Sequence, residues 1–220
     1  EGGDNHFRSE YFKMVKELSL ENDFLLIYDE VQTGIGITGK MWAHQHFCEV
    51  DCSPECISHC KPMEPDVISF GKKTQCCGIF AGGRINEIDN HVFKESSRIN
   101  STFGGNLIDM VRFTIYLELI EKEILVKKAA ENGAYLLSKL LELQKNSQGL
   151  VSNSRGRGLF CAYDLPTQRH RDQLIQNMEK EGALILGCGQ TSIRFRPHLN
   201  ISKDEIDMAI LMMKNSLAKF

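Results

Sequence analysis

Two short apolar runs in the first third of the chain each end at a charged residue. Residues 24–28 read Phe-Leu-Leu-Ile-Tyr and lead into Asp29, and the mostly apolar residues 66–71 lead into Lys72. Runs of this length and composition are typical of β-strands that are buried on both faces. The pattern therefore predicts two buried strands, with Asp29 and Lys72 at their ends.

Helical periodicity appears on both sides of these strands. Residues 9–21 place apolar side chains at helical spacing. The pattern is helical again from about 106 to 145, and we expect a break near Glu123 or at Gly133. Another short strand is expected at 79–81.

After Gly149 the chain changes to short elements of both kinds. The predicted elements are strands at 158–164, 183–186 and 192–196, a helix from about 168 to 181, and a helix after Ser202 that begins with a capping box. This order predicts a small α+β domain at 150–220. A helical segment at 123–149 is expected to link it to a larger domain at 1–122.

The composition gives no sign of a nucleic-acid or membrane protein. The 220 residues carry a formal net charge of −3, and the Lys and Arg residues are dispersed along the chain. No apolar stretch approaches the ~20 residues that a membrane span requires. The start, Glu1 to Asp4, has no signal-peptide character and no initiator Met, so we expect a cytoplasmic protein whose sequence begins mid-protein or after processing.

Four of the eight cysteines cluster within an expected insertion at about 48–63. They are Cys48, Cys52, Cys56 and Cys60. Pro54 interrupts the helix that would align them, and the spacing differs from the C-x2-C pairs of common zinc and iron–sulfur sites. We therefore expect no metal, and these four residues remain weak candidate ligands beside the alternative of incidental thiols.

The strand-end pair suggests a particular chemistry. Ligands of open α/β sheets bind beyond the carboxyl ends of the strands. A Lys that forms a Schiff base and an Asp that keeps a pyridine nitrogen protonated are the two groups that pyridoxal phosphate requires. The alternative is that Asp29 is a turn residue and Lys72 a solvated side chain.

Six stretches carry a family resemblance. In order they are residues 1–8 (EGGDNHFR), 29–34 (DEVQTG), 70–75 (FGKKTQ), 100–106 (NSTFGGN), 155–158 (RGRG) and 192–197 (SIRFRP). With them, the whole chain resembles the C-terminal half of a class III, fold-type I pyridoxal-phosphate aminotransferase. The resemblance implies an α/β fold, with part of the cofactor-binding large domain, built on a mainly parallel sheet, followed by the small C-terminal α+β domain.

The resemblance also implies how the cofactor is held. Lys72 would form the Schiff base, with its neighbour Lys73 as the runner-up, and Asp29 would pair with the ring nitrogen. Val31 would pack against the ring. Gln32 would hydrogen-bond the ring hydroxyl and approach the substrate.

Three further residues receive roles from the same resemblance. Thr102 would donate to the cofactor phosphate across the interface of a homodimer; its alternative is a plain helix N-cap. Arg194 would bind a carboxylate of 2-oxoglutarate, since its fork matches that group. Glu1 would pair with Arg194 when a terminal-amine substrate is bound and release it for the keto acid.

The implied reaction moves the ε-amine of L-lysine to 2-oxoglutarate. It would yield glutamate and a semialdehyde that cyclises to a piperideine carboxylate. A 4-aminobutyrate or ornithine aminotransferase is the alternative within the class. The family's upstream half supplies a phosphate loop, a stacking aromatic ring and a substrate-binding Arg that this sequence lacks. The alternative from another class is therefore a non-catalytic remnant that keeps the fold, possible metal binding at the Cys cluster included.

Overall fold

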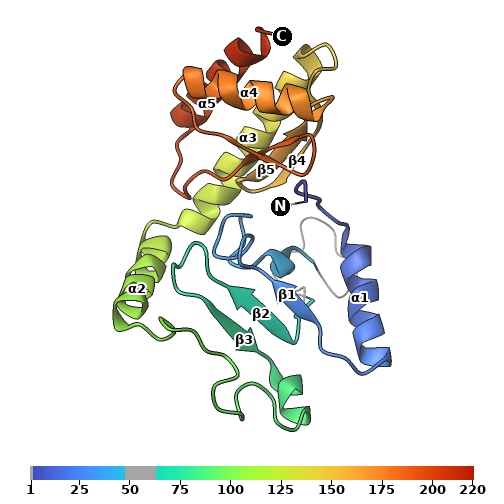
Figure 1. Cartoon of the computed structure of the whole chain (residues 1–220), viewed down its shortest axis with the longest axis vertical. Helices are drawn as coiled ribbons and strands as arrows, with labels where there is room; N and C mark the ends of the chain where they lie inside the picture. Colours follow the sequence, from blue (N-terminus) through green and yellow to red (C-terminus); the bar gives the residue numbers. More distant parts are fainter. Residues whose placement is uncertain (1, 48–62) are drawn as a thin grey trace. The chain divides into compact units, whose positions relative to one another are not determined.

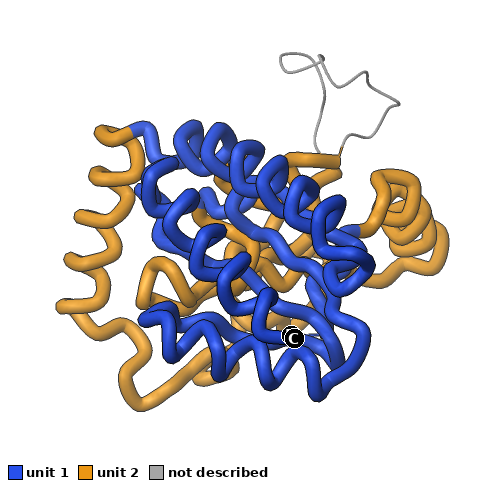
Figure 2. Tube along the Cα trace, turned by 90° about the horizontal axis from the view of Figure 1, so that it is seen from above, with its two compact units in different colours: residues 1–6, 36–39, 124–220 blue, residues 7–35, 40–123 orange. Residues whose placement is uncertain are grey.

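The computed structural model describes residues 2–47 and 63–220. The chain divides into two compact units, coloured separately in Figure 2. The first unit comprises residues 1–6, 36–39 and 124–220, and the second comprises residues 7–35 and 40–123. The division after Glu123 lies next to the predicted end of the larger domain, whereas two short N-terminal segments group with the C-terminal part of the chain.

The second unit is built on a three-stranded sheet (Figure 1). Its strands, in spatial order, are β1 (Ile27–Asp29), β2 (Val67–Phe70) and β3 (Gly78–Ala81). The first two strands run parallel, with Asp29 opposite Ser69, whereas β3 is antiparallel to β2. The carboxyl ends of β1 and β2 therefore meet at one edge of the sheet, and Lys72 follows two residues after β2.

Burial of the predicted strands differs from the expectation. Val67 and Phe70 of β2 are buried, but Ile27 of β1 is 61% exposed and Asp29 is exposed. The prediction that both strands are buried on both faces is thus wrong for β1. The physical reason is that β1 has only three residues and, within the described part of the chain, a neighbouring strand on one side only.

The two α-helices of the second unit, α1 (Ser9–Glu21) and α2 (Leu107–Lys122), follow the predicted periodicity. The unit also contains two short 3₁₀ helices that were not predicted, η1 (Ala43–His46) and η2 (Gly83–Glu87). The break expected near Glu123 is confirmed: Ile124 adopts a left-handed conformation between α2 and the next helix. At the start of α2, Asn106 accepts a hydrogen bond from the Ile108 amide at 2.9 Å and caps the helix.

The first unit is an α+β layer pair, as predicted (Figure 1). Its antiparallel sheet has the strand order β4 (Ser152–Arg157), β5 (Phe160–Asp164), β7 (Ser192–Phe195) and β6 (Leu186–Cys188), and its helices are α3 (Leu125–Asn146), α4 (Gln168–Lys180) and α5 (Lys203–Leu217). The capping box at the start of α5 is confirmed by reciprocal hydrogen bonds between Ser202 and Glu205.

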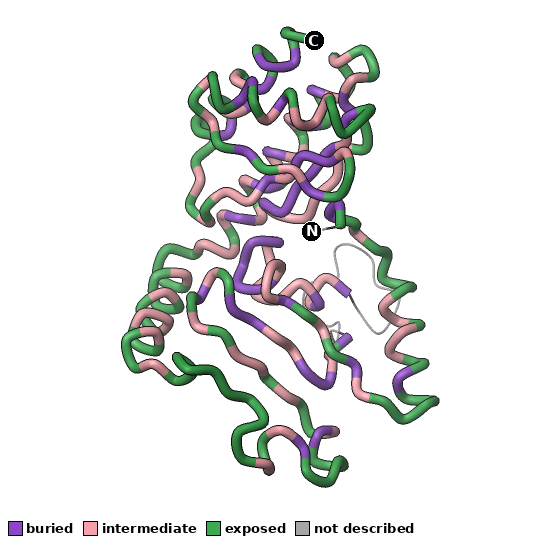
Figure 3. The backbone as a smooth tube through the Cα atoms, viewed as in Figure 1, coloured by how far each residue is buried: buried purple, intermediate pink, exposed green. Residues whose placement is uncertain are grey.

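The core of the first unit lies between its helices and its sheet (Figure 3). Its fully buried side chains include Leu140, Tyr163, Leu174, Met178, Ile193, Ile206 and Met213. Burial of such side chains is the main favourable term in folding. This packed core fixes the strands that contain the RGRG motif (155–158) and the SIRFRP motif (192–197).

Gly133 lies inside α3 and does not break the helix. A Cβ atom there would lie 2.0 Å from the carbonyl carbon of Gly158, which itself has a left-handed φ of +54°. The next residue, Leu159, donates its amide to Ile37 O at 2.8 Å. Both glycines are therefore needed for the close approach of three chain segments.

None of the helices in the described part of the chain combines the length and the apolar character that crossing a bilayer demands.

Candidate active site

Asp29 is held at the end of β1 by two hydrogen bonds. Its Oδ1 accepts from Ser69 Oγ at 2.9 Å and from the Val31 amide at 3.0 Å. Ser69 belongs to β2, so the side chain joins the two parallel strands at their carboxyl ends. Both bonds end on Oδ1, which leaves Oδ2 to accept from a ring N–H that approaches this edge.

The two neighbouring lysines differ in their surroundings. Lys73 Nζ donates to the backbone carbonyl of Gln32 and so joins the turn after β2 to the chain after β1. Lys72 is exposed. Gln32 is therefore fixed through its backbone, and Lys73 has a positioning contact that Lys72 does not share.

The expectation of a buried carboxylate beside a buried amine is wrong for the described residues. Asp29 and Lys72 are both exposed. The reason is that Asp29 ends the short strand β1 and Lys72 follows the short strand β2, at the points where the chain turns away from the sheet. The structure brings Asp29, Val31, Gln32 and the 71–74 turn to the same sheet edge, but it does not enclose them.

Sequence reasoning missed Glu30, which lies between the predicted site residues and is buried. Its carboxylate accepts hydrogen bonds from the Ala43 amide at 2.5 Å and the His44 amide at 2.9 Å, and the His44 Nδ1 lies 2.9 Å away. Burial raises the pKa of Glu30, but the hydrogen bonds from His44 and Ala43 outweigh burial and leave the pKa below its ordinary value. Glu30 thus anchors the loop that carries Val31.

The predicted phosphate-binding loop lies before α2. Thr102 is exposed and lies in a turn, five residues before Leu107, the first residue of α2. The alternative reading of Thr102 as the helix cap is wrong, because Asn106 caps the helix.

The predicted Cys cluster cannot be compared with the structure. Cys48, Cys52, Cys56 and Cys60 lie outside the described residues. Within residues 2–47 and 63–220, no group of three or more His, Cys, Asp or Glu side chains is arranged to hold a metal ion. His44, which lies near the cluster in sequence, contacts Glu30.

Arg194 lies on β7 in the first unit, opposite Ala162 of β5 and Leu186 of β6. Side chains of a strand alternate between its two faces, so Ser192 and Arg194 share one face of β7, and Arg196 follows directly after the strand. Glu1 lies outside the described residues, but the segment that follows it lies against this part of the first unit.

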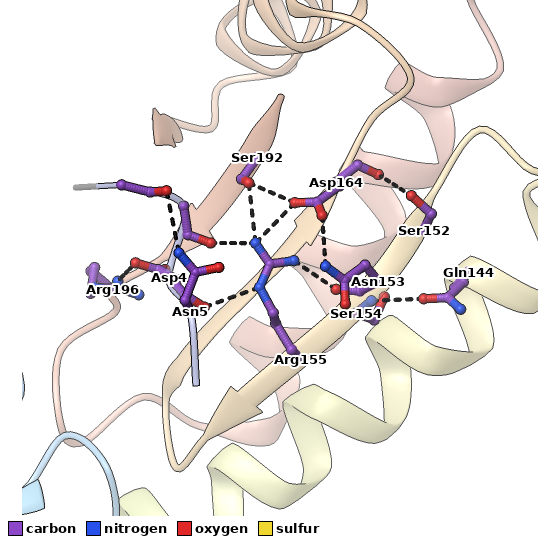
Figure 4. A network of polar contacts seen from close by, with 12 residues as sticks. Asp4, Asn5, Gln144, Ser152, Asn153, Ser154, Arg155, Asp164, Ser192 and Arg196 are labelled. Carbon is purple, nitrogen blue, oxygen red and sulfur yellow. Dashed lines mark hydrogen bonds and ion pairs between the residues drawn. The ribbon is translucent and has the colours of Figure 1, made fainter. Parts of the chain in front are cut away.

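That segment is held by a network of arginines and carboxylates (Figure 4). Arg196 pairs with Asp4 Oδ1 at 2.5 Å, and Arg155 donates to the Asp4 carbonyl at 3.0 Å. Arg155 also pairs with Asp164 at 2.9 Å, and Ser192 Oγ donates to the same Asp164 oxygen at 2.6 Å. Burial raises the pKa of Asp164, but the hydrogen bonds from Ser192, Asn153 and Arg155 hold it below its ordinary value.

The site residues thus form two groups. Asp29, Val31, Gln32, Lys72 and Thr102 belong to the second unit, and Arg194 belongs to the first. The first group can orient an aromatic cationic ring and present an amine, whereas Arg194 can bind a carboxylate.

Comparison with known proteins decides the family. The family model described as aminotransferase class-III matches residues 1–217. The chain belongs to the class-III aminotransferase family. The predicted family and the fold-type I class are thereby confirmed.

This class-III chain is similar to several curated aminotransferases. It is 46% identical over 217 residues to the L-lysine-epsilon aminotransferase of Mycobacterium tuberculosis, a match that covers 99% of the chain and 45% of the relative. It is 33% identical to the mitochondrial 4-aminobutyrate aminotransferase of Sus scrofa, over 100% of the chain and 40% of the relative. The chain spans about half the length of the curated relatives it matches.

A solved structure supports the same assignment. The lysine aminotransferase from M. tuberculosis in the internal aldimine form superposes with a TM-score of 0.87 at 45% identity. The match covers 99% of this chain and 47% of that one. The class-III chain therefore has the fold of the corresponding half of that enzyme.

Proposed function

We propose that this chain takes part in a pyridoxal-phosphate-dependent transamination that moves the ε-amine of L-lysine to 2-oxoglutarate. The products are glutamate and a semialdehyde that cyclises to a piperideine carboxylate. The observation that carries the proposal is the sheet edge at which Ser69 and the Val31 amide orient Asp29. The 46% identity to L-lysine-epsilon aminotransferases supports the choice of donor.

The residues present fit the cofactor. Asp29 Oδ2 would accept a hydrogen bond from the protonated pyridine nitrogen, Val31 would pack on the ring, and Gln32 would donate to the ring hydroxyl. Thr102, in its exposed turn before α2, donates to the phosphate. When bound, pyridoxal phosphate supplies an aldehyde that condenses with amines and a ring that withdraws electrons from the amine-bearing carbon.

Lys72 is the proposed base and nucleophile. Its free amine would move the proton from the ε-carbon of lysine to the cofactor, and would move a proton in the opposite direction when 2-oxoglutarate takes the amine. Lys73 is a poorer candidate because its ammonium group donates to the Gln32 carbonyl. Its positioning contact supports a role in holding Gln32.

Arg194 and Glu1 are proposed to serve the two substrates in turn. The Arg194 guanidinium binds a carboxylate of 2-oxoglutarate through two parallel hydrogen bonds. Glu1 neutralises Arg194 while lysine, which carries no second carboxylate, is bound. We further propose that the chain works in the cytoplasm as part of a homodimer, with Thr102 reaching the partner's cofactor.

The experiment traces the transferred nitrogen. The purified chain is incubated with pyridoxal phosphate, 2-oxoglutarate and L-lysine labelled with ¹⁵N at the ε-position, and ¹⁵N-glutamate is measured by mass spectrometry. We expect label from the ε-position and none from lysine labelled at the α-position. Parallel reactions with 4-aminobutyrate and ornithine test the alternative donors.

Two matched variants test the assignment of the base. We expect Lys72→Ala to lower the rate at least about a hundredfold, as loss of an acid–base group does, whereas Lys73→Ala retains Lys72 and loses less. Absence of ¹⁵N-glutamate with any donor would refute the proposed activity of this chain and favour the non-catalytic alternative. A greater loss in Lys73→Ala would exchange the roles of the two lysines.

A further inference from the structure

The loop of residues 71–77, here called the lysine loop, joins β2 to β3 in the sheet of the second unit (Figure 1). Its two ends are held together by the strand pair of Phe70 with Gly78. The loop contains Lys72, the proposed nucleophile, and its neighbour Lys73. What fixes the conformation of this loop therefore decides which of the two amines reaches the sheet edge.

Thr74 lies at the centre of the lysine loop, and its side chain is fully buried. Its Oγ1 lies 2.7 Å from the Gly71 carbonyl and 2.7 Å from the Cys76 carbonyl, and its amide donates to the Gly71 carbonyl at 3.1 Å. The hydroxyl can donate its proton to either carbonyl, while its oxygen accepts from the Cys76 amide at 3.4 Å. One buried hydroxyl thus links the residue before Lys72 to the opposite side of the loop.

The two neighbours of this buried threonine are tied to segments outside the loop. The Lys73 ammonium donates to the backbone carbonyl of Gln32. Gln75 has a left-handed φ of 51°, which persists only where the surroundings hold it, and its Oε1 accepts from Arg112 of α2 at 2.8 Å. The conformation of the loop therefore places the Lys73 ammonium on another segment and leaves Lys72 exposed at the sheet edge.

We propose that Thr74 is a positioning residue that makes Lys72, rather than Lys73, the amine presented to the cofactor. A Schiff base forms from a free amine, so the Lys73 ammonium must leave the Gln32 carbonyl and lose a proton before it reacts. Thr74 maintains this difference by holding the two sides of the loop together. The inference rests on the proposed role of Lys72.

The test identifies which lysine reacts with pyridoxal phosphate, and it needs no turnover. The purified chain is incubated with pyridoxal phosphate and then with sodium borohydride. A lysine amine condenses with the aldehyde and releases water, and borohydride delivers hydride to the resulting C=N bond, so that a stable secondary amine remains. Peptide mass spectrometry then gives the labelled fractions of Lys72, of Lys73 and of Lys127, an exposed lysine of the first unit. We expect Lys72 to carry at least about ten times the label of Lys73, because Lys73 must first lose a charge-assisted hydrogen bond.

Thr74→Val approximately keeps the shape of the side chain and removes its hydroxyl. We expect this variant to lower the ratio of Lys72 label to Lys73 label at least about threefold, because the loop loses the hydroxyl that joins its two sides. Thr74→Ser retains a hydroxyl and should keep the ratio of the unaltered chain. Thr114→Val is the matched control: it removes an exposed hydroxyl of α2 that donates to the Met110 carbonyl at 3.0 Å, and it should leave the ratio unchanged.

Urea unfolding of the same variants separates positioning from a purely structural role. A structural role alone lowers the free energy of unfolding without changing which amine reacts. A Thr74→Val chain that is less stable but keeps the label ratio would therefore overturn the proposal. If Thr74→Val does not fold, Thr74→Cys, which has a weaker donor of similar size, carries the label measurement.

The labelled fractions also separate this inference from the proposed function. If Lys72 of the unaltered chain carries no more label than Lys127, the proposed role of Lys72 is wrong, and the inference is wrong with it. If Lys72 exceeds both Lys73 and Lys127 but Thr74→Val leaves the ratio unchanged, the role of Lys72 is supported and only the inference about Thr74 is wrong.

Discussion

His6, in the N-terminal segment of the first unit, should make that unit sensitive to acid. Its ring lies edge-on against Phe160, with 5.9 Å between centroids, and its Nε2 has no hydrogen-bond partner among the described residues. Burial, and then the positive charge of Arg157, lower the pKa of His6 from 6.5 to about 4, although Asp4 acts in the opposite direction. The imidazole is therefore neutral in the folded chain near neutral pH.

The sign of the effect follows from proton binding in the two states. Between pH 6.5 and about 4 the unfolded chain binds a proton at His6 that the folded chain does not bind, so stability falls as the pH is lowered. From pH 7 to pH 5, these two pKa values give a loss of about 2 kcal/mol in the free energy of unfolding. Because the ring is only partly buried, we expect about 1 kcal/mol after solvent screening.

Two measurements check this prediction. Nuclear magnetic resonance follows the His6 ring protons during a pH titration, and urea unfolding at pH 7 and pH 5 compares the chain with His6→Gln. The variant should lose about 1 kcal/mol less on acidification. His198→Gln, which removes an exposed histidine of the same unit, should follow the unaltered chain. A His6 pKa above 6, or parallel acid losses for the chain and His6→Gln, would refute the reasoning.

Two further predictions concern the frame of the first unit. Gly133→Ala should lower the free energy of unfolding by about 2 kcal/mol or more, because overpacking against Gly158 outweighs the ~1 kcal/mol that Ala gains in a helix. An unchanged or raised urea midpoint would show that the contact between α3 and Gly158 is not rigid. Ser202→Ala should lower the free energy of unfolding by about 1 kcal/mol, because the Glu205 amide loses the side chain that caps it. Urea unfolding measures the change, and Ser138→Ala in α3 is the control. Equal effects of the two substitutions would argue against the capping box.

Elements with a clear local pattern were predictable from the sequence. The helix expected at 9–21 forms as α1 with the same bounds, and the expected strand at 79–81 forms as β3. The helical stretch from about 106 divides where predicted, after Lys122. Gly133, the alternative point of division, does not divide the helix; a glycine that ends a helix and one that admits a neighbouring backbone look alike in sequence.

The candidate site was predictable where its residues are joined by neighbouring strands. Asp29 and Lys72 reach one sheet edge because β1 and β2 are parallel, as the resemblance to the family implied. The contact between Glu30 and His44 was not predictable, because His44 lies 14 residues further along the chain in a segment without periodicity. Arg155 and Asp4 are 151 residues apart in the sequence, and a contact over such a separation cannot be predicted from local sequence patterns.

The segment of residues 2–6 explains why hydrophobic patterning fails at this end of the molecule. Its residues, Gly-Gly-Asp-Asn-His, include no aliphatic side chain, so burial of apolar surface contributes little to holding it. The segment is held instead by contacts with β4. This strand was not predicted because its sequence, Ser-Asn-Ser-Arg-Gly-Arg, has no apolar alternation. Yet these polar residues anchor the segment: Arg155 donates to the Asp4 carbonyl at 3.0 Å, and Asn153 donates to Asp164 at 2.8 Å. A strand whose sequence departs from the hydrophobic rule is thus the one that fixes the segment next to the proposed carboxylate site, as expected where function and local folding preference compete.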